Sequence, residues 1–172
     1  AGRRYRTGDL ITIETVVAEV GVSRSMAREA LQALNHMRLI DLQPRVGAVV
    51  RPLQAWDVLN PAVIEWRLAL GSSERMWRSL TELRAAIEPA AARLAAIRAP
   101  GDVCRDLLNL AYDLKQLGMQ GLPDEAARTR YRDIDASFHR TMLAGSQNEM
   151  FSSLTDPLHK ALNHRIDRHF AG

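Results

Sequence analysis

Four side chains in one short stretch could make contacts to nucleic acid. Arg24 and Arg28 are four residues apart, so on a helix they share a face. A guanidinium can pair with both O6 and N7 of guanine, or with a phosphate. Ser23 and Ser25 place hydroxyl groups where the first backbone N–H groups of a helix bind phosphate. We therefore predict that this stretch binds DNA.

A second pair of side chains could bind a metal ion. Asp135 and His139 are four residues apart, and a carboxylate oxygen and an imidazole nitrogen at this spacing can hold one divalent cation. The same spacing also suits a plain hydrogen bond on a helix surface. The pair by itself leaves both interpretations open.

Arg84 is a candidate anchor for a carboxylate ligand, because a guanidinium pairs with a carboxylate through two hydrogen bonds. Glu88 lies four residues further on and could take the same guanidinium in an ordinary ion pair along the helix. The sequence supports the two interpretations about equally. Glu88 itself, followed by Pro89, is interpreted as part of a helix kink and not as a ligand.

The arginines need a helix with one polar face. At about 100° per residue from Arg24, the polar side chains of residues 24–37 cluster between about 0° and 140°, and the apolar ones between about 180° and 340°. Ser23 is a typical N-cap residue. Residues 13–20 predict a shorter helix that ends at Gly21. Two helices joined by so short a turn are typical of a helix-turn-helix.

A small β-ribbon is expected after the second helix. Residues 39–43 and 46–51 are short and β-branched, which predicts two strands with Gly47 at the tip between them. Arg45 suits the negative potential of a DNA minor groove, and glycine permits close approach of the backbone. This ribbon is the expected wing of the DNA-binding unit.

The rest of the chain reads as helical, so the predicted fold class is mainly α. We expect a winged helix-turn-helix with a small β-ribbon over residues 1–51, a linker over 52–61, and an all-helical bundle over 62–172. Residues 1–10 read as a loop. The chain begins with alanine and not methionine, and we expect the first helix of the DNA-binding unit to be missing.

Composition narrows the possible classes of protein. The 172 residues are 47% hydrophobic and only 5% aromatic, which favours helices over a sheet-rich fold. The single cysteine, Cys104, excludes a disulfide framework and a cysteine-ligated zinc site. No apolar run reaches the roughly 18 residues of a membrane helix, and no leader is visible, so we expect a cytoplasmic protein with no membrane partner. Residues 1–55 hold eight arginines against five acidic residues, which accounts for the whole net charge of +3.

Residues 21–34 (GVSRSMAREALQAL) resemble the winged helix-turn-helix signature of GntR-family bacterial transcription regulators. Residues 5–10 resemble the family's approach to that motif, with threonine replacing its proline, and residues 39–50 resemble its wing. The second segment resembles the all-helical FCD effector domain of the FadR subfamily. The supporting residues are Arg84, residues 88–91 (EPAA), Asp135, Phe138, His139 and residues 146–148 (SQN). The resemblance covers nearly the whole chain.

This resemblance implies a ligand-responsive regulator and not an enzyme. Ser23, Arg24 and Arg28 would contact double-stranded operator DNA, with Gly47 at the minor groove. The protein would bind a palindromic operator as a homodimer and would respond to a small carboxylate effector. Repression is the commoner role in the family, so the resemblance implies a repressor. Residues 56–61 (WDVLNP) resemble the linker of members that sense sugar acids such as galactonate. One departure is Glu14, which stands where another member has a DNA-binding arginine, so we expect that contact to be absent.

The resemblance also implies a divalent metal ion, zinc or similar, at Asp135 and His139 together with two further histidines on later helices. His159, His164 and His169 lie too close to His139 to match those two histidines. We therefore expect an incomplete metal site and missing C-terminal helices, because a bundle without them would expose a large apolar surface. His164 and Arg165 remain candidates for lining the effector site.

Two other classes of function are weighed against the regulator. A metal-dependent enzyme, or a metal-sensing helical module, would be centred on Asp135 and His139, but the sequence has no Glu-x-x-His pair nearby and no glycine-flanked serine. A helical adaptor for protein partners would leave the capped arginine helix and the wing unexplained. Binding of a DNA duplex with a steep salt dependence separates the regulator from the adaptor.

Overall fold

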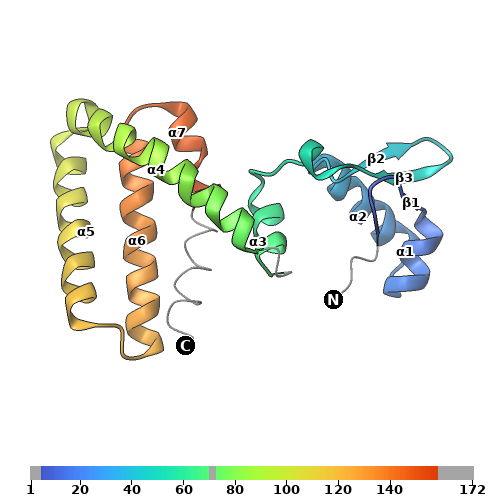
Figure 1. Cartoon of the computed structure of the whole chain (residues 1–172), viewed down its shortest axis with the longest axis horizontal. Coiled ribbons are helices and arrows are strands. Elements are labelled where there is room, and N and C mark those ends of the chain that lie inside the picture. The colour runs from blue at the N-terminus through green and yellow to red at the C-terminus, as the bar shows by residue number, and fades with distance from the viewer. Residues whose placement is uncertain (1–4, 70–72, 159–172) are drawn as a thin grey trace. The chain divides into compact units, whose positions relative to one another are not determined.

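The computed structural model describes residues 5–69 and 73–158 (Figure 1). It confirms the predicted fold class, since helices dominate and one small sheet lies near the N-terminus. The chain forms two compact units, Ala1–Val63 and Ile64–Gly172, and each is described by itself.

The first unit is a pair of helices beside a small sheet. In chain order its elements are β1 (Leu10–Ile11), α1 (Ile13–Val20), α2 (Arg24–His36), β2 (Ile40–Gln43), β3 (Gly47–Val50) and a single 3-10 turn (Leu53–Ala55). The sheet has three antiparallel strands in the order β1-β3-β2. Val49 of β3 therefore pairs with Leu10 on one side and with Asp41 on the other.

The sheet differs from the sequence expectation in one respect. A two-stranded ribbon was predicted, with residues 1–10 as a loop, whereas Leu10 and Ile11 form a third strand. Two residues are too few for the alternation of side chains to be visible in a sequence. This strand exists because β3 offers its second edge, where the backbone N–H of Val50 donates to the carbonyl oxygen of Asp9 over 3.0 Å.

Local capping explains why the two helices are so close in sequence. Thr12 caps α1 by accepting from the backbone N–H of Thr15, and Ser23 caps α2 by accepting from that of Met26. Gly21 ends α1 with φ of 74°, a left-handed conformation that glycine adopts without a steric penalty. Only one residue, Val22, separates the two cap residues Gly21 and Ser23, so α2 starts almost directly after α1.

The core of the first unit is smaller than the apolar pattern of α2 suggests. Ile11, Leu31, Ile40 and Ala48 form a buried cluster, and Ala27 of α2 is also fully buried. The remaining apolar face of α2, which the helical angles place with the buried residues, is exposed at Met26, Ala30 and Ala33. Among the described residues, α1 and β2 are the main elements that pack against α2, and they cover only part of its apolar arc.

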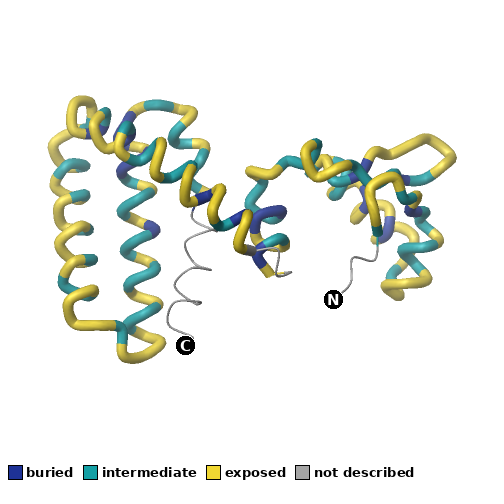
Figure 2. Tube along the Cα trace, in the orientation of Figure 1, coloured by how far each residue is buried: buried dark blue, intermediate teal, exposed yellow. Residues whose placement is uncertain are grey.

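The second unit is built from helices that pack side by side. After α3 (Pro61–Ala69), which begins at the end of the first unit, come α4 (Ser73–Arg98), α5 (Gly101–Gln120), α6 (Glu125–Gly145) and α7 (Glu149–Ser153). α6 packs against both α4 and α5, and α5 runs alongside it in Figure 1. Burial is concentrated where α4 meets α6, while α5 has no buried residue (Figure 2). The central cluster includes Ile64, Leu80, Met142 and Leu143.

The end of α4 is fastened to the end of α6 by side chains. Arg98 donates to the carbonyl oxygen of Ser146 over 3.1 Å, and the Gln147 amide donates to the carbonyl oxygen of Arg98 over 2.9 Å. Gly145 lies in close contact with Ala95 and Val103, where an added Cβ would come within 3.5 Å of both side chains. These contacts set the register between α4 and α6.

None of the helices in residues 5–69 and 73–158 is both long and apolar enough to cross a lipid bilayer.

Gly47 is required by the sheet, and its substitution tests this. Its φ is 133°, and a Cβ built there would lie 2.7 Å from the carbonyl oxygen of Ile11. We expect Gly47→Ala to destabilise the first unit by about 1–3 kcal/mol, because backbone strain adds to the clash. Hydrogen exchange of the amides in β1 and β3 measures this loss.

Gly8→Ala is the matched control, since Gly8 has φ of 90° but nothing within 4 Å of an added Cβ. It carries the backbone strain without the clash, so its loss of protection should be smaller than that of Gly47→Ala. Equal losses in the two variants would contradict the assignment of the clash to Ile11.

Candidate functional site

The predicted DNA-binding residues of α2 lie together on its first turns. Ser23, Arg24, Ser25 and Arg28 are all exposed, and we call them the α2 basic surface. The hydroxyl oxygens of Ser23 and Ser25 are 2.9 Å apart. Ala27 and Leu31 are buried, which turns the arginines outward. The α2 basic surface therefore exposes two hydroxyl groups and two guanidinium groups at the start of one helix.

The wing is the loop between β2 and β3, and Arg45 is exposed within it. Arg45 has φ of 65°, which is uncommon for a residue other than glycine. The backbone N–H of Val46 donates to the carbonyl oxygen of Gln43 over 3.2 Å and closes the loop. Gly47 is half-buried beside β1, so its small size is already explained by the clash that a Cβ would make with Ile11.

Glu14 interacts with the α2 basic surface in a way that the sequence did not reveal. Its carboxylate accepts a hydrogen bond of 2.6 Å from the guanidinium of Arg24. Hydrogen bonding to its own backbone N–H, then to Thr12 and Arg24, keeps the pKa of the Glu14 carboxyl below its ordinary value. The two residues are ten positions apart on different helices, so no spacing rule within one helix could identify the pair.

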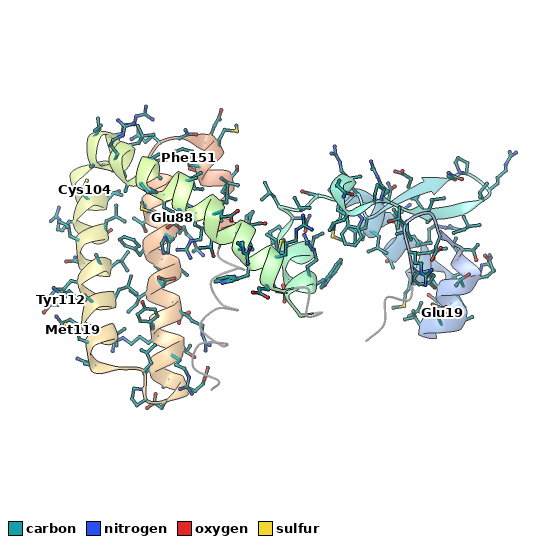
Figure 3. The ribbon with its side chains drawn as sticks, in the orientation of Figure 1. Glu19, Glu88, Cys104, Tyr112, Met119 and Phe151 are labelled. Carbon is teal, nitrogen blue, oxygen red and sulfur yellow. The ribbon has the colours of Figure 1, made fainter. Side chains whose placement is uncertain are left out.

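A second group of candidate site residues lies between α4 and α6. Arg84 and Glu88 come from α4, and Asp135 and His139 come from α6; we call these four residues the charged cluster. Their side chains are only 13–19% exposed. Glu88, labelled in Figure 3, accepts from Arg84 Nε over 2.6 Å and lies 3.2 Å from His139 Nδ1. The structure thus joins Arg84 to the predicted Asp135–His139 pair through Glu88.

His139 is surrounded by charges of both signs. Its Nε2 lies 2.8 Å from Arg84 Nη2 and 3.5 Å from Asp135 Oδ1. Burial disfavours the charged ring, but hydrogen bonds to Asp135 and Glu88 and the charge of Glu88 outweigh burial and the repulsion by Arg84. The pKa of His139 therefore lies above its ordinary value.

The carboxyl group of Glu88 stays ionised in this setting. Burial raises the pKa of Glu88. Hydrogen bonds from His139 and Arg84, together with their charges, lower this pKa by more than burial raises it, so the net shift is downward. The interpretation of Glu88 as only part of a helix kink was therefore too narrow. The spacing of four residues predicted the ion pair with Arg84, which the structure confirms, but it gave no sign of the contact between Glu88 and His139 on α6.

Among the described residues, the charged cluster does not present a complete set of metal ligands. Within the described ranges, no group of three or more histidine, cysteine, aspartate or glutamate side chains converges as metal ligands do. The guanidinium of Arg84 lies against Nε2 of His139, where a cation would meet a positive charge. The predicted role of Asp135 and His139 as metal ligands stays a prediction. His159, His164, Arg165 and His169 lie outside the described residues.

Comparisons with known protein families identify the domains that contain the α2 basic surface and the charged cluster. Residues 1–50 match the family described as bacterial regulatory proteins, gntR family, and residues 79–171 match the FCD domain. The second match alone covers more than half of the chain. This chain is a GntR-family protein with an FCD domain. The resemblance inferred from residues 21–34 and from the second segment is confirmed.

Three curated relatives are regulators, and none is named as an enzyme. The chain is 28% identical to the galactonate operon transcriptional repressor of Escherichia coli over 88% of its own length and 64% of the relative's. It is 25% identical to the transcriptional regulator YieP of the same organism, over 90% of this chain and 66% of the relative. It is 27% identical to the transcriptional regulator LutR of Bacillus subtilis, over 87% of this chain and 64% of the relative. The chain thus spans about two thirds of the length of these relatives.

A solved structure of similar fold supports the fold assignment. The structure of Lar, which controls the expression of the Listeria monocytogenes agr system, is similar to this chain. The match has a TM-score of 0.50 and 14% identity. The match covers 93% of this chain and 64% of the other. At this identity the likeness concerns the fold alone.

The raised pKa of His139 predicts a pH-dependent stability of the second unit. The protonated ring stabilises the folded chain fully at pH values below about 6.5, the ordinary pKa of histidine, and this contribution is lost as the pH rises through the higher folded value. We expect the melting temperature of the chelator-treated protein to fall more between pH 6 and pH 8 than that of His139→Gln. Thermal unfolding followed by circular dichroism measures both.

His36→Gln, at an exposed histidine of the first unit, is the control and should follow the wild-type curve. Parallel pH curves for the wild type and His139→Gln would show that the cluster binds the neutral ring, with Nε2 accepting from Arg84.

Proposed function

We propose that this protein is a ligand-responsive transcription regulator that binds double-stranded operator DNA through the first unit. α2 would enter the major groove, and the loop with Arg45 would lie at the minor groove. The main support for this proposal is the α2 basic surface, where Arg24 and Arg28 lie on one face of a helix that is capped by Ser23. Membership of the GntR family supports the same function.

The proposed assembly on DNA is a homodimer on a palindromic operator. A single recognition helix buries little surface, and specific protein–DNA interfaces need on the order of 1,000 Å² or more of protein surface. Two copies related by a two-fold axis would double the contacts and read an inverted repeat. Since operator DNA lies in the bacterial cytoplasm, that is the proposed location.

The proposed effector is a small carboxylate that binds at the charged cluster. Arg84 is the anchor, because its guanidinium already holds the Glu88 carboxylate at 2.6 Å and could hold a ligand carboxylate in the same geometry. The relative from Escherichia coli is a repressor of a galactonate operon, which supports repression and a sugar acid or another organic acid as the effector. The linker at 52–61 would carry the coupling between effector and DNA binding.

An enzyme centred on Asp135 and His139 is not favoured. The two ring nitrogens of His139 already face partners within the cluster, since Nδ1 lies 3.2 Å from the Glu88 carboxylate and Nε2 lies 2.8 Å from the Arg84 guanidinium. The matched relatives are transcription regulators. A regulator explains both the charged cluster and the α2 basic surface, whereas an enzyme leaves the α2 basic surface without a role.

Selection from a pool of random DNA duplexes at two salt concentrations tests the DNA-binding function with two variants. We expect Arg28→Ala to lose about tenfold in preference at one base pair of the selected inverted repeat, since a bidentate contact to guanine discriminates by about 1–3 kcal/mol. We expect Arg45→Ala to weaken binding to all sequences similarly and to reduce the salt slope by about 1. Fluorescence anisotropy with the selected duplex measures both.

Arg105→Ala, at an exposed arginine on α5 in the second unit, is the control for a simple loss of positive charge. It should leave sequence preference unchanged. A wild-type protein that is folded but enriches no sequence, or binds duplexes without salt dependence, would contradict the proposed function.

Arg84→Gln tests the effector site separately from DNA binding. We expect the variant to bind the selected duplex with wild-type affinity but to lose at least tenfold in sensitivity to the effector, because an amide cannot hold a carboxylate by a charge-assisted bidentate pair. Galactonate and a panel of related sugar acids and hydroxy acids serve as probes, added to the protein–DNA complex and followed by anisotropy.

Arg93→Gln, at an exposed arginine on the same helix, is the matched control and should respond to the effector as the wild type does. Equal release of DNA by the wild type and Arg84→Gln would remove Arg84 from the effector site. Circular dichroism confirms that each variant retains its helices.

A further inference from the structure

Glu14 is a carboxylate within the surface that the proposed function assigns to DNA. Its side chain is 63% exposed, and that of its partner Arg24 is 68% exposed. A DNA-facing surface gains affinity from positive charge, so an exposed carboxylate there lowers attraction to phosphate. Its hydrogen bond of 2.6 Å with Arg24 indicates that Glu14 acts on this arginine.

The backbone places both partners of this ion pair at the start of a capped helix. Glu14 lies in the first turn of α1, whose N-cap is Thr12, and Arg24 is the first residue of α2, whose N-cap is Ser23. The positive end of the α1 dipole favours the carboxylate at this place. The carboxylate is therefore well positioned to restrain the long side chain of Arg24, which otherwise has many rotamers.

We propose that Glu14 positions Arg24 so that its guanidinium reads a base, guanine by preference, and not a phosphate. The inference rests on the proposed DNA-binding function and adds a specificity-determining residue to it. Glu14 does not itself need to touch DNA. It acts through Arg24 and is a positioning residue.

Charge and geometry both support this assignment. A guanidinium has five N–H donors, and the Glu14 carboxylate takes one at Nη2, so the others remain for a second partner. A phosphate at that place would bring a second full negative charge close to Glu14, whereas the O6 and N7 edge of guanine carries only partial charges. The carboxylate also offsets the repulsion between Arg24 and Arg28, one turn apart on α2.

A purely structural role is the competing explanation. Exposed ion pairs stabilise proteins by only about 0–1 kcal/mol, so a pair between α1 and α2 could hold the helices together slightly and do nothing else. This role predicts a small change in melting temperature and no change in the DNA sequence that is bound. The two explanations therefore differ in sequence preference and not in stability.

The test compares the whole chain with Glu14→Gln, which removes the charge at nearly constant shape. Each protein selects from the same pool of random duplexes, and binding of the selected duplex, its single-base variants and a non-specific duplex is then measured at several salt concentrations. We expect Glu14→Gln to lose about tenfold in preference for guanine at one position in each half-site. Its affinity for the non-specific duplex should rise, with a salt slope steeper by about 1, because Arg24 is then free to bind phosphate.

Two controls isolate the pair. Glu29→Gln removes the same charge from an exposed position on α2 and should leave the guanine preference unchanged. In an Arg24→Ala background, Glu14→Gln should cause no further loss of preference, because a residue that acts through Arg24 has no effect without it.

Wild-type preference retained in Glu14→Gln, with only a change in melting temperature, would overturn the inference and leave the proposed function intact. The same holds if Glu14→Gln lowers the preference equally in the presence and absence of the Arg24 side chain. A wild-type chain that selects no sequence would overturn the proposed function and the inference with it.

Discussion

A guanidinium held by a glutamate lies in the candidate site of each unit, and the surroundings of the two pairs differ sharply. Arg24 and Glu14 are more than 60% exposed, so water and salt screen their attraction. Arg84 and Glu88 are less than 20% exposed, so breaking their contact would remove the main charge partner of each in surroundings that screen little. The exposed pair leaves the other donors of Arg24 accessible to an external partner, whereas the buried pair is suited to exchange one carboxylate for another.

Each of these pairs depends on how its helices are held. The exposed pair depends on helix ends, since Gly21 in its left-handed conformation brings the start of α2 close to α1. The buried pair depends on helix packing, since Arg98 and Gln147 fasten the ends of α4 and α6 together. Leu80 of α4 and Leu143 of α6 belong to one buried cluster, and its close packing keeps the polar side chains of the two helices within hydrogen-bonding distance.

Under the proposed function, ligands compete with internal carboxylates in both units. A carboxylate effector would compete with Glu88 for Arg84, and a DNA phosphate would compete with Glu14 for Arg24. Such competition lowers affinity for any anion that lacks further contacts and thereby favours partners that add them. The internal carboxylates thus contribute selectivity at the expense of affinity.

The sequence by itself determined the features that depend on neighbours within one or two helical turns: the cap at Ser23, the arginine face of α2, the Arg84–Glu88 spacing, and the family. The first three follow from periodicity and from side chains that meet within four residues, whereas the family follows from the resemblance of residues 21–34 and of the second segment to known signatures. Tertiary structure alone decided which apolar residues of α2 are covered, that β1 exists, and that Glu14 meets Arg24. It also decided that Glu88 bridges α4 to His139. Such contacts join separate elements, and the distances between elements are set by packing, which no local pattern encodes.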